Sequence, residues 1–167
     1  MATWHVAQMN VGTLLHPVAD PRIAEFVSLP DQVNAVADAS PGFVWRLQSA
    51  GGNATGIPVS DNAKFIVNMS VWQSVAALFD FVYRGAHRMA MARRRTWFQP
   101  RDGAYQVLWW VPAGSTPAVE EGLERLHRLR HAGPSQQAFT FRAKYPPPGL
   151  SEPPEDMQPQ PYCVGWA

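Results

Sequence analysis

The sequence predicts an α+β fold in which one antiparallel sheet carries helices on one face, with the element order β-α-β-β-α-β. Three observations predict it. Segments rich in β-branched and aromatic residues recur along the chain, well-punctuated helical segments separate them, and a turn-rich loop at 51–63 joins the second and third strand segments. This order is the ferredoxin-like arrangement, here followed by an extra C-terminal helix and a proline-rich tail.

Four segments have the composition of strands: residues 3–11, 42–49, 64–72 and 105–112. Residues 64–72 alternate, which places Asn68, Ser70 and Trp72 on one face and apolar residues on the other. Residues 105–112 are apolar on both faces, so we expect this strand to be buried on both sides. Residues 138–142 are a candidate for a further short strand.

The helical segments carry recognisable start and stop signals. Asp20 followed by Pro21 predicts a helix start, Pro30 is expected to interrupt that helix, and Asp31 to cap a second piece. Segment 116–134 has a Thr-Pro start, acids in its first turn, and arginine and histidine in its last turn. Those charges match the helix dipole and therefore indicate stabilisation rather than function.

Ser74 is expected to cap the helix after the third strand. If so, Tyr83, His87 and Arg94, spaced four and seven residues apart, align on the boundary between a buried stripe and a solvated face. The pattern fits either the wall of a pocket or an ordinary amphipathic helix, and it leaves both open. A nucleic-acid-binding arm is excluded, because the arginines do not share one face and the net charge is only +1.

Composition bounds the domain count and the partners. The 167 residues suit one domain, which we place at residues 1–145, with an extended tail at 146–167. Apolar residues make up 46% of the chain, and charged residues only 16%, below the ~25% typical of soluble domains. A single sheet with helices on one face would leave its second face bare, and exposing that much apolar surface is unfavourable. A face-to-face homodimer is the simplest remedy.

Several function classes have no support in the sequence. Cys163 is the only cysteine, no secretory signal pattern opens the chain, and no apolar run approaches the length of a membrane span, so we expect a cytoplasmic protein. No nucleotide-binding or serine-hydrolase motif is present, and the histidines show no metal-ligand spacing. We therefore expect no metal, no nucleotide cofactor, and no nucleic-acid or membrane partner.

Five phrases, in order, resemble an uncharacterised bacterial family of the dimeric α+β barrel superfamily: "PGFVWRLQ", "NMSVWQSVAALFDFVYRGAH", "RRRTWF", "LWWVPAG" and "AFTFR". The resemblance runs from about residue 4 to residue 146. It implies a ferredoxin-like protomer and a homodimer. The superfamily includes cofactor-free monooxygenases of polycyclic aromatics, isomerases and decarboxylases of small aromatic substrates, and haem-degrading monooxygenases.

The resemblance and the residues together predict a small-molecule tailoring enzyme of secondary metabolism. We expect it to be monooxygenase-like or isomerase- or cyclase-like, and to act on an aromatic or conjugated, polyketide-type substrate without a cofactor. The expected catalytic residues are His87, Tyr83 and Arg46. The expected substrate-binding residues are Asn10, Asn68, Trp72, Phe81, Arg94, Trp97 and Trp109.

Two alternatives stay open. In the first, the protein binds or degrades haem, because the haem-degrading branch carries an axial histidine near the position of His87 and an asparagine on strand one that Asn10 matches. This chain has Phe81 where that branch has a catalytic tryptophan. In the second, the protein is a non-catalytic ligand-binding or scaffold dimer, and the polar residues only hold its interface together.

Overall fold

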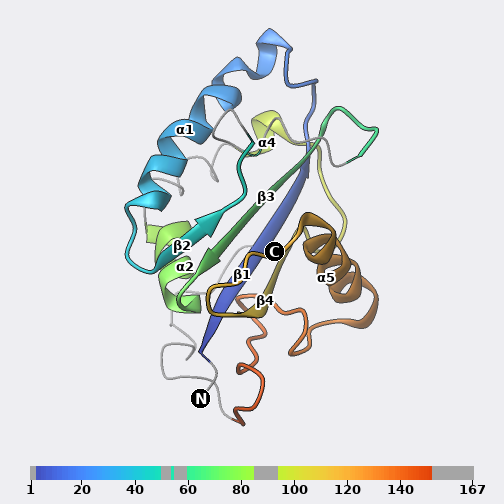
Figure 1. Cartoon of the computed structure of the whole chain (residues 1–167). Helices are drawn as coiled ribbons and strands as arrows, with labels where there is room; N and C mark the ends of the chain where they lie inside the picture. The colour runs from blue at the N-terminus through green and yellow to red at the C-terminus, as the bar shows by residue number, and fades with distance from the viewer. Residues whose placement is uncertain (1–2, 50–53, 55–59, 85–93, 152–167) are drawn as a thin grey trace.

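The computed structural model describes residues 3–49, 54, 60–84 and 94–151. Four antiparallel strands form one sheet in the order β2-β3-β1-β4 (Figure 1). The strands are β1 (Trp4–Thr13), β2 (Phe43–Arg46), β3 (Phe65–Trp72) and β4 (Gln106–Pro112). All four strand predictions and the ferredoxin-like α+β class are confirmed.

The long strand β1 lies in the middle of the sheet and pairs with both β3 and β4. The β2–β3 register shifts between Phe43 and Trp45, which bends the short edge strand. No strand forms at 138–142. Phe139 instead makes a single bridge to Leu108, in which each backbone N–H donates to the other residue's carbonyl at 2.8 Å.

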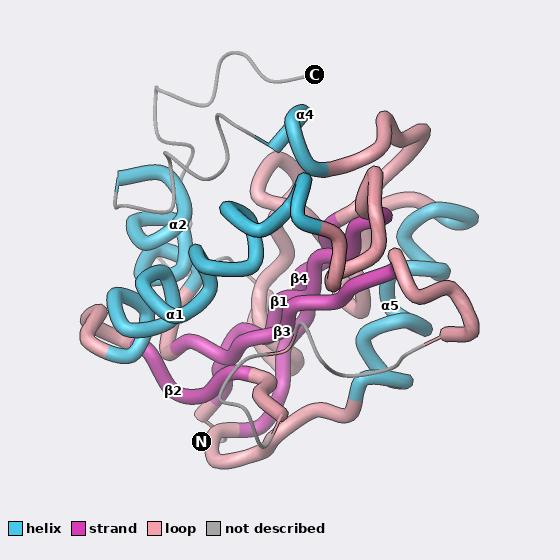
Figure 2. Tube along the Cα trace, turned by 90° about the horizontal axis from the view of Figure 1, so that it is seen from above, coloured by secondary structure: helices cyan, strands magenta, loops and turns pink. Residues whose placement is uncertain are grey.

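Helices lie on both faces of the sheet. Figure 2 shows α1 (Ala24–Asp38) and α2 (Val75–Arg84) on one side and α5 (Val119–Ala132) on the other. The short α4 (Arg94–Trp97) packs its Trp97 with Leu14 and Ile23. The helices between strands share one face, as predicted, and the extra C-terminal helix covers the opposite face.

The expectation of a bare second face is wrong for this chain. Met9, Met69 and Trp109 on that face are fully buried, and they form one core with Leu126 and Leu129 of α5. The apolar surface that seemed to require a partner subunit is therefore already covered within the chain. The homodimer stays a prediction.

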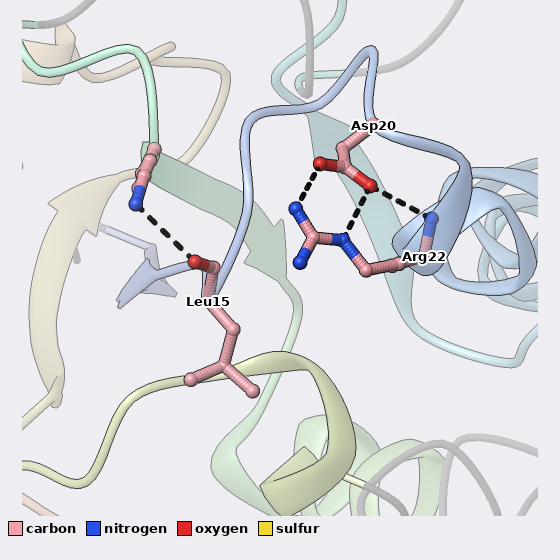
Figure 3. A network of polar contacts seen from close by, with 4 residues as sticks. Leu15, Asp20 and Arg22 are labelled. Atoms are coloured by element: carbon pink, nitrogen blue, oxygen red, sulfur yellow. Dashed lines mark hydrogen bonds and ion pairs between the residues drawn. The ribbon is translucent and has the colours of Figure 1, made fainter.

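The first helix begins as predicted and then departs from the prediction. Figure 3 shows the contacts between Asp20 and Arg22 at its start. The Asp20 carboxylate accepts hydrogen bonds from the Arg22 backbone N–H at 2.9 Å and from the Arg22 guanidinium at 2.9 and 2.7 Å. A short 3-10 turn, η1 (Pro21–Ile23), follows and leads into α1. Pro30 does not interrupt α1. It removes only one backbone hydrogen bond, and the packing of Phe26 and Leu29 stabilises the helix enough to offset that loss.

The helix after β3 begins as the sequence indicates. The Ser74 hydroxyl accepts a hydrogen bond from the Ala77 backbone N–H at 3.1 Å. None of the helices among the described residues has the length and apolar character needed to cross a membrane. The predicted tail at 146–167 lies mostly outside the described residues and stays a prediction.

Candidate functional site

A cavity of about 170 Å³ lies between the sheet and the helices of the α1 and α2 side. Its floor is formed by β1 and β3, with Gln106 from β4 and Arg46 from β2. Its roof comes from α1, α2 and α4. The connection after each helix returns the chain to this sheet, which brings residues far apart in the sequence to one concave space.

The floor carries polar side chains in register across neighbouring strands. Asn10 of β1 pairs with Asn68 of β3 on one side and with Gln106 of β4 on the other. One step along the sheet, Gln8 pairs with Ser70. Directly opposed residues on adjacent strands share a face, so these side chains form a continuous polar surface under the cavity.

Part of this floor is fixed by hydrogen bonds. Gln106 Nε2 donates to Gln8 Oε1 at 3.2 Å, and Gln8 Nε2 donates to Ser70 Oγ at 3.2 Å. Trp72 Nε1 also donates to Ser70 Oγ, at 2.9 Å. The Ser70 oxygen thus accepts twice, which occupies both of its lone pairs. Ser70 lines the cavity, and its hydroxyl can still donate one hydrogen bond.

Two amides of the floor have no internal partner. The side chains of Asn10 and Asn68 make no hydrogen bond with other described residues, and Asn68 is exposed although it lines the cavity. Each amide offers one acceptor and two donor hydrogens. The pair can therefore hold an oxygen-bearing ligand without breaking an existing hydrogen bond.

Aromatic rings form the walls at two places. The Trp72 and Phe81 rings stack with centroids 5.0 Å apart. Near α4, the Phe26 ring lies 5.7 Å from Trp97 and 5.2 Å from Phe98. A flat apolar ligand would meet ring surfaces at both places and polar groups beneath it.

Two arginines line the cavity, and no described carboxylate does. Arg46 Nε donates to Asp38 Oδ1 at 2.8 Å and Nη2 donates to Oδ2 at 3.2 Å, so the pair is bidentate. The Arg94 guanidinium carbon lies 3.8 Å from the centroid of the Tyr105 ring, in a cation–π arrangement. Because Asp38 balances the charge of Arg46, the positive character of the cavity lies mainly at Arg94.

The structure brings most of the expected site residues to this one cavity. The expected residues that line it are Asn10, Arg46, Asn68, Trp72, Phe81, Tyr83, Arg94 and Trp97. Tyr83 is 41% exposed and packs its ring against Phe79, 4.6 Å away. His87 falls outside the described residues. The roles assigned to these residues stay predictions.

Trp109 is the expected wall residue that the structure places elsewhere. It is fully buried on the α5 face, and its Nε1 donates to Glu121 Oε1 at 3.0 Å. Both faces of β4 are apolar, so alternation alone did not show which face each tryptophan occupies. Trp109 is therefore a core residue and not part of this cavity.

Sequence reasoning also left out cavity residues. Ser70, Gln106 and Tyr105 line the cavity but were not among the expected site residues. The alternation of 64–72 had already placed Ser70 on the face of Asn68, so that signal was available. The place of Gln106 depends on the β1–β4 register, which the sequence does not reveal.

The described residues do not hold a metal-binding cluster. No group of three or more histidine, cysteine, aspartate or glutamate side chains comes together among residues 3–49, 54, 60–84 and 94–151. His127 and His131 of α5 stack with ring centroids 3.9 Å apart, but they form only a pair. The predicted haem alternative depends on His87, about which the described residues give no information.

Comparison with known proteins gives a family without an assigned function. A family model described as a domain of unknown function, DUF3291, matches residues 5–155. No curated protein matches the chain.

Three solved structures are similar over most of their own length. The cofactor-independent oxygenase SnoaB from Streptomyces nogalater is 19% identical, with a TM-score of 0.45 over 67% of this chain and 95% of that one. The protein of unknown function NE2512 from Nitrosomonas europaea is 12% identical, with a TM-score of 0.44 over 71% and 99%. The monooxygenase from the gene ActVA-Orf6 of Streptomyces coelicolor, in complex with Nanaomycin D, is 15% identical, with a TM-score of 0.37 over 70% and 92%.

Proposed function

The chain belongs to the DUF3291 family, whose description carries no function, and from its cavity we propose a small-molecule tailoring enzyme. It binds a flat aromatic or conjugated substrate that carries oxygen atoms, and it transforms this substrate without a nucleotide cofactor. The reaction is monooxygenase-like, with isomerisation or cyclisation as the second form of the same proposal.

One observation carries this proposal. A row of amide side chains crosses three strands in register under a cavity whose walls are aromatic rings. Asn68 is exposed, Asn10 is half-buried, and neither side chain has a hydrogen-bond partner among the described residues. Amides that line a cavity and keep their donors and acceptors available fit ligand recognition better than a structural role.

The chemistry assigns a role to each group. Asn10 and Asn68 donate to a substrate carbonyl or enolate oxygen, which stabilises negative charge as it develops there. In an oxygenase reaction of an anthrone, the ring CH₂ group opposite the carbonyl reacts with O₂ to give a new carbonyl and one water, which balances without an external reductant. The substrate first loses a proton to a base. We assign the acceptance of that proton to Tyr83 together with His87.

Arg46 has a narrower role than the sequence indicated. Its Nε and Nη2 already donate to Asp38, and this carboxylate balances the charge of the guanidinium. We therefore propose that the Arg46–Asp38 pair borders the floor at the β2 edge, and we do not assign a direct two-point clamp to Arg46.

An oxygen-consumption assay with a tricyclic anthrone tests the proposal. Wild-type protein is compared with Asn68→Ala, which removes an amide from the floor, and with Gln73→Ala, which removes an exposed amide outside this cavity. We expect consumption of one O₂ per quinone formed, a loss of about tenfold or more in Asn68→Ala, and wild-type rates in Gln73→Ala.

Other outcomes distinguish the alternatives. Conversion of substrate without oxygen consumption would select the isomerase form. Binding without any conversion would favour a ligand-binding protein. A haem titration that gives a saturable Soret band in wild type but not in His87→Ala would favour the haem alternative over this proposal.

A further inference from the structure

Arg94 stands at the α4 end of the cavity. Its guanidinium lies over the Tyr105 ring at 3.8 Å and near the Phe98 ring at 5.5 Å, and all three residues line the cavity. No carboxylate pairs with Arg94 among the described residues. The two rings hold the guanidinium in place by its face, which leaves the N–H groups at its edge able to bind a ligand.

Two more arginines stand at the same end of the sheet. Arg101 Nη2 donates to Thr13 Oγ1 at 3.2 Å, while its Nε is buried and has no hydrogen-bond partner. Arg130 of α5 donates from Nε to the Ala104 carbonyl at 2.7 Å. Burial lowers the pKa of Arg101, and the nearby charges of Arg130 and Arg94 lower it further. Arg101 is thus close enough to both of the other cations to be repelled by them.

This positive charge is not balanced within the described residues. Elsewhere in this part of the chain arginines pair with acids: Arg22 with Asp20, Arg46 with Asp38, and Arg125 with Glu121. No such partner meets any member of the cluster of Arg94, Arg101 and Arg130. Arg94 is the member of this group that lines the cavity, and an anion bound to it would offset the repulsion between Arg94 and Arg101.

We propose that this arginine cluster binds the carboxylate of the ligand, so that the substrate class is an aromatic or conjugated carboxylic acid. The inference rests on the proposed function and names its substrate class. Arg94 makes the direct contact, and Arg101, which lies outside the lining of the cavity, supplies charge behind it. Arg94 is the member of the cluster that lines the cavity, and the planar edge of one guanidinium matches the two oxygens of one carboxylate.

Calorimetric titration with 3-hydroxy-2-naphthoate and with its uncharged relative 2-naphthol tests the carboxylate site. We expect the naphthoate to bind wild type about tenfold or more tightly than naphthol, since a charge-assisted contact is the only added interaction. Arg94→Gln should remove most of that preference, and Arg94→Lys should keep part of it, because the charge remains but the planar group is lost. Circular dichroism of each variant verifies its fold.

The matched control is Arg95→Gln, which removes the same charge from the exposed neighbour in α4. It should leave the preference for naphthoate intact. Arg101→Gln should reduce the preference and its dependence on salt, while 2-naphthol binding stays at the wild-type value.

Each remaining outcome overturns a specific statement. Equal binding of both ligands, unchanged in Arg94→Gln, would overturn the carboxylate site and leave the aromatic cavity standing. Competition by inorganic phosphate but not by benzoate would overturn the carboxylate in favour of a phosphate. Binding of neither ligand would contradict the proposed function itself, and the carboxylate site with it.

Discussion

Asn68 and Met69 are neighbours on β3, point to opposite faces of the sheet, and meet opposite surroundings. Met69 is fully buried in a continuous apolar core under α5. Asn68 is exposed to a cavity under α1, α2 and α4, beside amides and a serine hydroxyl. The same strands thus present one apolar face that packs into the core and one polar face that lines a cavity. Side-chain alternation along the strands separates the two faces.

The strongest test of the difference between the two faces is to place a polar side chain at position 69 and an apolar side chain at position 68. We expect Met69→Asn to lower the free energy of unfolding by about 3–5 kcal/mol, because it removes a buried apolar side chain and buries an unpaired amide. We expect Asn68→Met to change it by less than about 0.5 kcal/mol, because an exposed side chain without internal partners is replaced. Urea denaturation measures both. Similar losses in the two variants would show that the faces do not differ as described.

Close packing at the edge of the cavity gives the next largest effect. A Cβ on Gly12 would overlap the Phe98 ring, and both residues line the cavity. We expect Gly12→Ala to lower the free energy of unfolding by about 1–3 kcal/mol, because the ring must shift against its neighbours. Thermal unfolding and ligand titration measure the effect. Adding Phe98→Leu should restore part of the loss, and an additive double variant would contradict a direct clash.

The ion pair at the edge of the polar face is expected to matter less. Asp38→Asn should lower the free energy of unfolding by about 0–1 kcal/mol, because the Asp38 side chain is 47% exposed and water screens the pair. The effect should shrink at high salt, which denaturation in 0.05 and 1 M NaCl measures. A salt-independent loss of several times this size would show that Arg46 depends on Asp38 for much more than its charge.

The smallest expected effect lies outside both faces, at the start of α1. The hydrogen bonds from the Arg22 side chain and backbone hold the pKa of Asp20 well below its ordinary value. A lowered carboxyl pKa stabilises the folded protein fully above the ordinary value, and this contribution is lost as the pH falls toward the folded pKa. We expect Asp20→Asn to lower Tm slightly at pH 6 and the difference from wild type to shrink below about pH 4. A difference that grows in acid would contradict this sign.

Several local features of the fold could be predicted from the residues themselves. β-Branched and aromatic runs identified the four strands, and Ser74 and the Asp20–Pro21 pair identified helix starts. The interruption predicted at Pro30 was wrong, because the packing of the helix outweighs the one hydrogen bond that proline removes. The candidate strand at 138–142 is not formed, because strand propensity does not show whether a neighbouring strand can pair with more than one residue of the segment.

The sequence by itself determined that the strands have two unlike faces, because a period of two places Asn68 and Ser70 opposite Met69 and Val71. Only the tertiary structure decided which helices cover which face, since alternation identifies faces but not their partners. Because of this packing, Trp109 lies in the core under α5, while Arg94, Tyr105 and the amides of three strands line one cavity. Contacts between residues so distant in sequence depend on strand order and register, which local preferences do not encode.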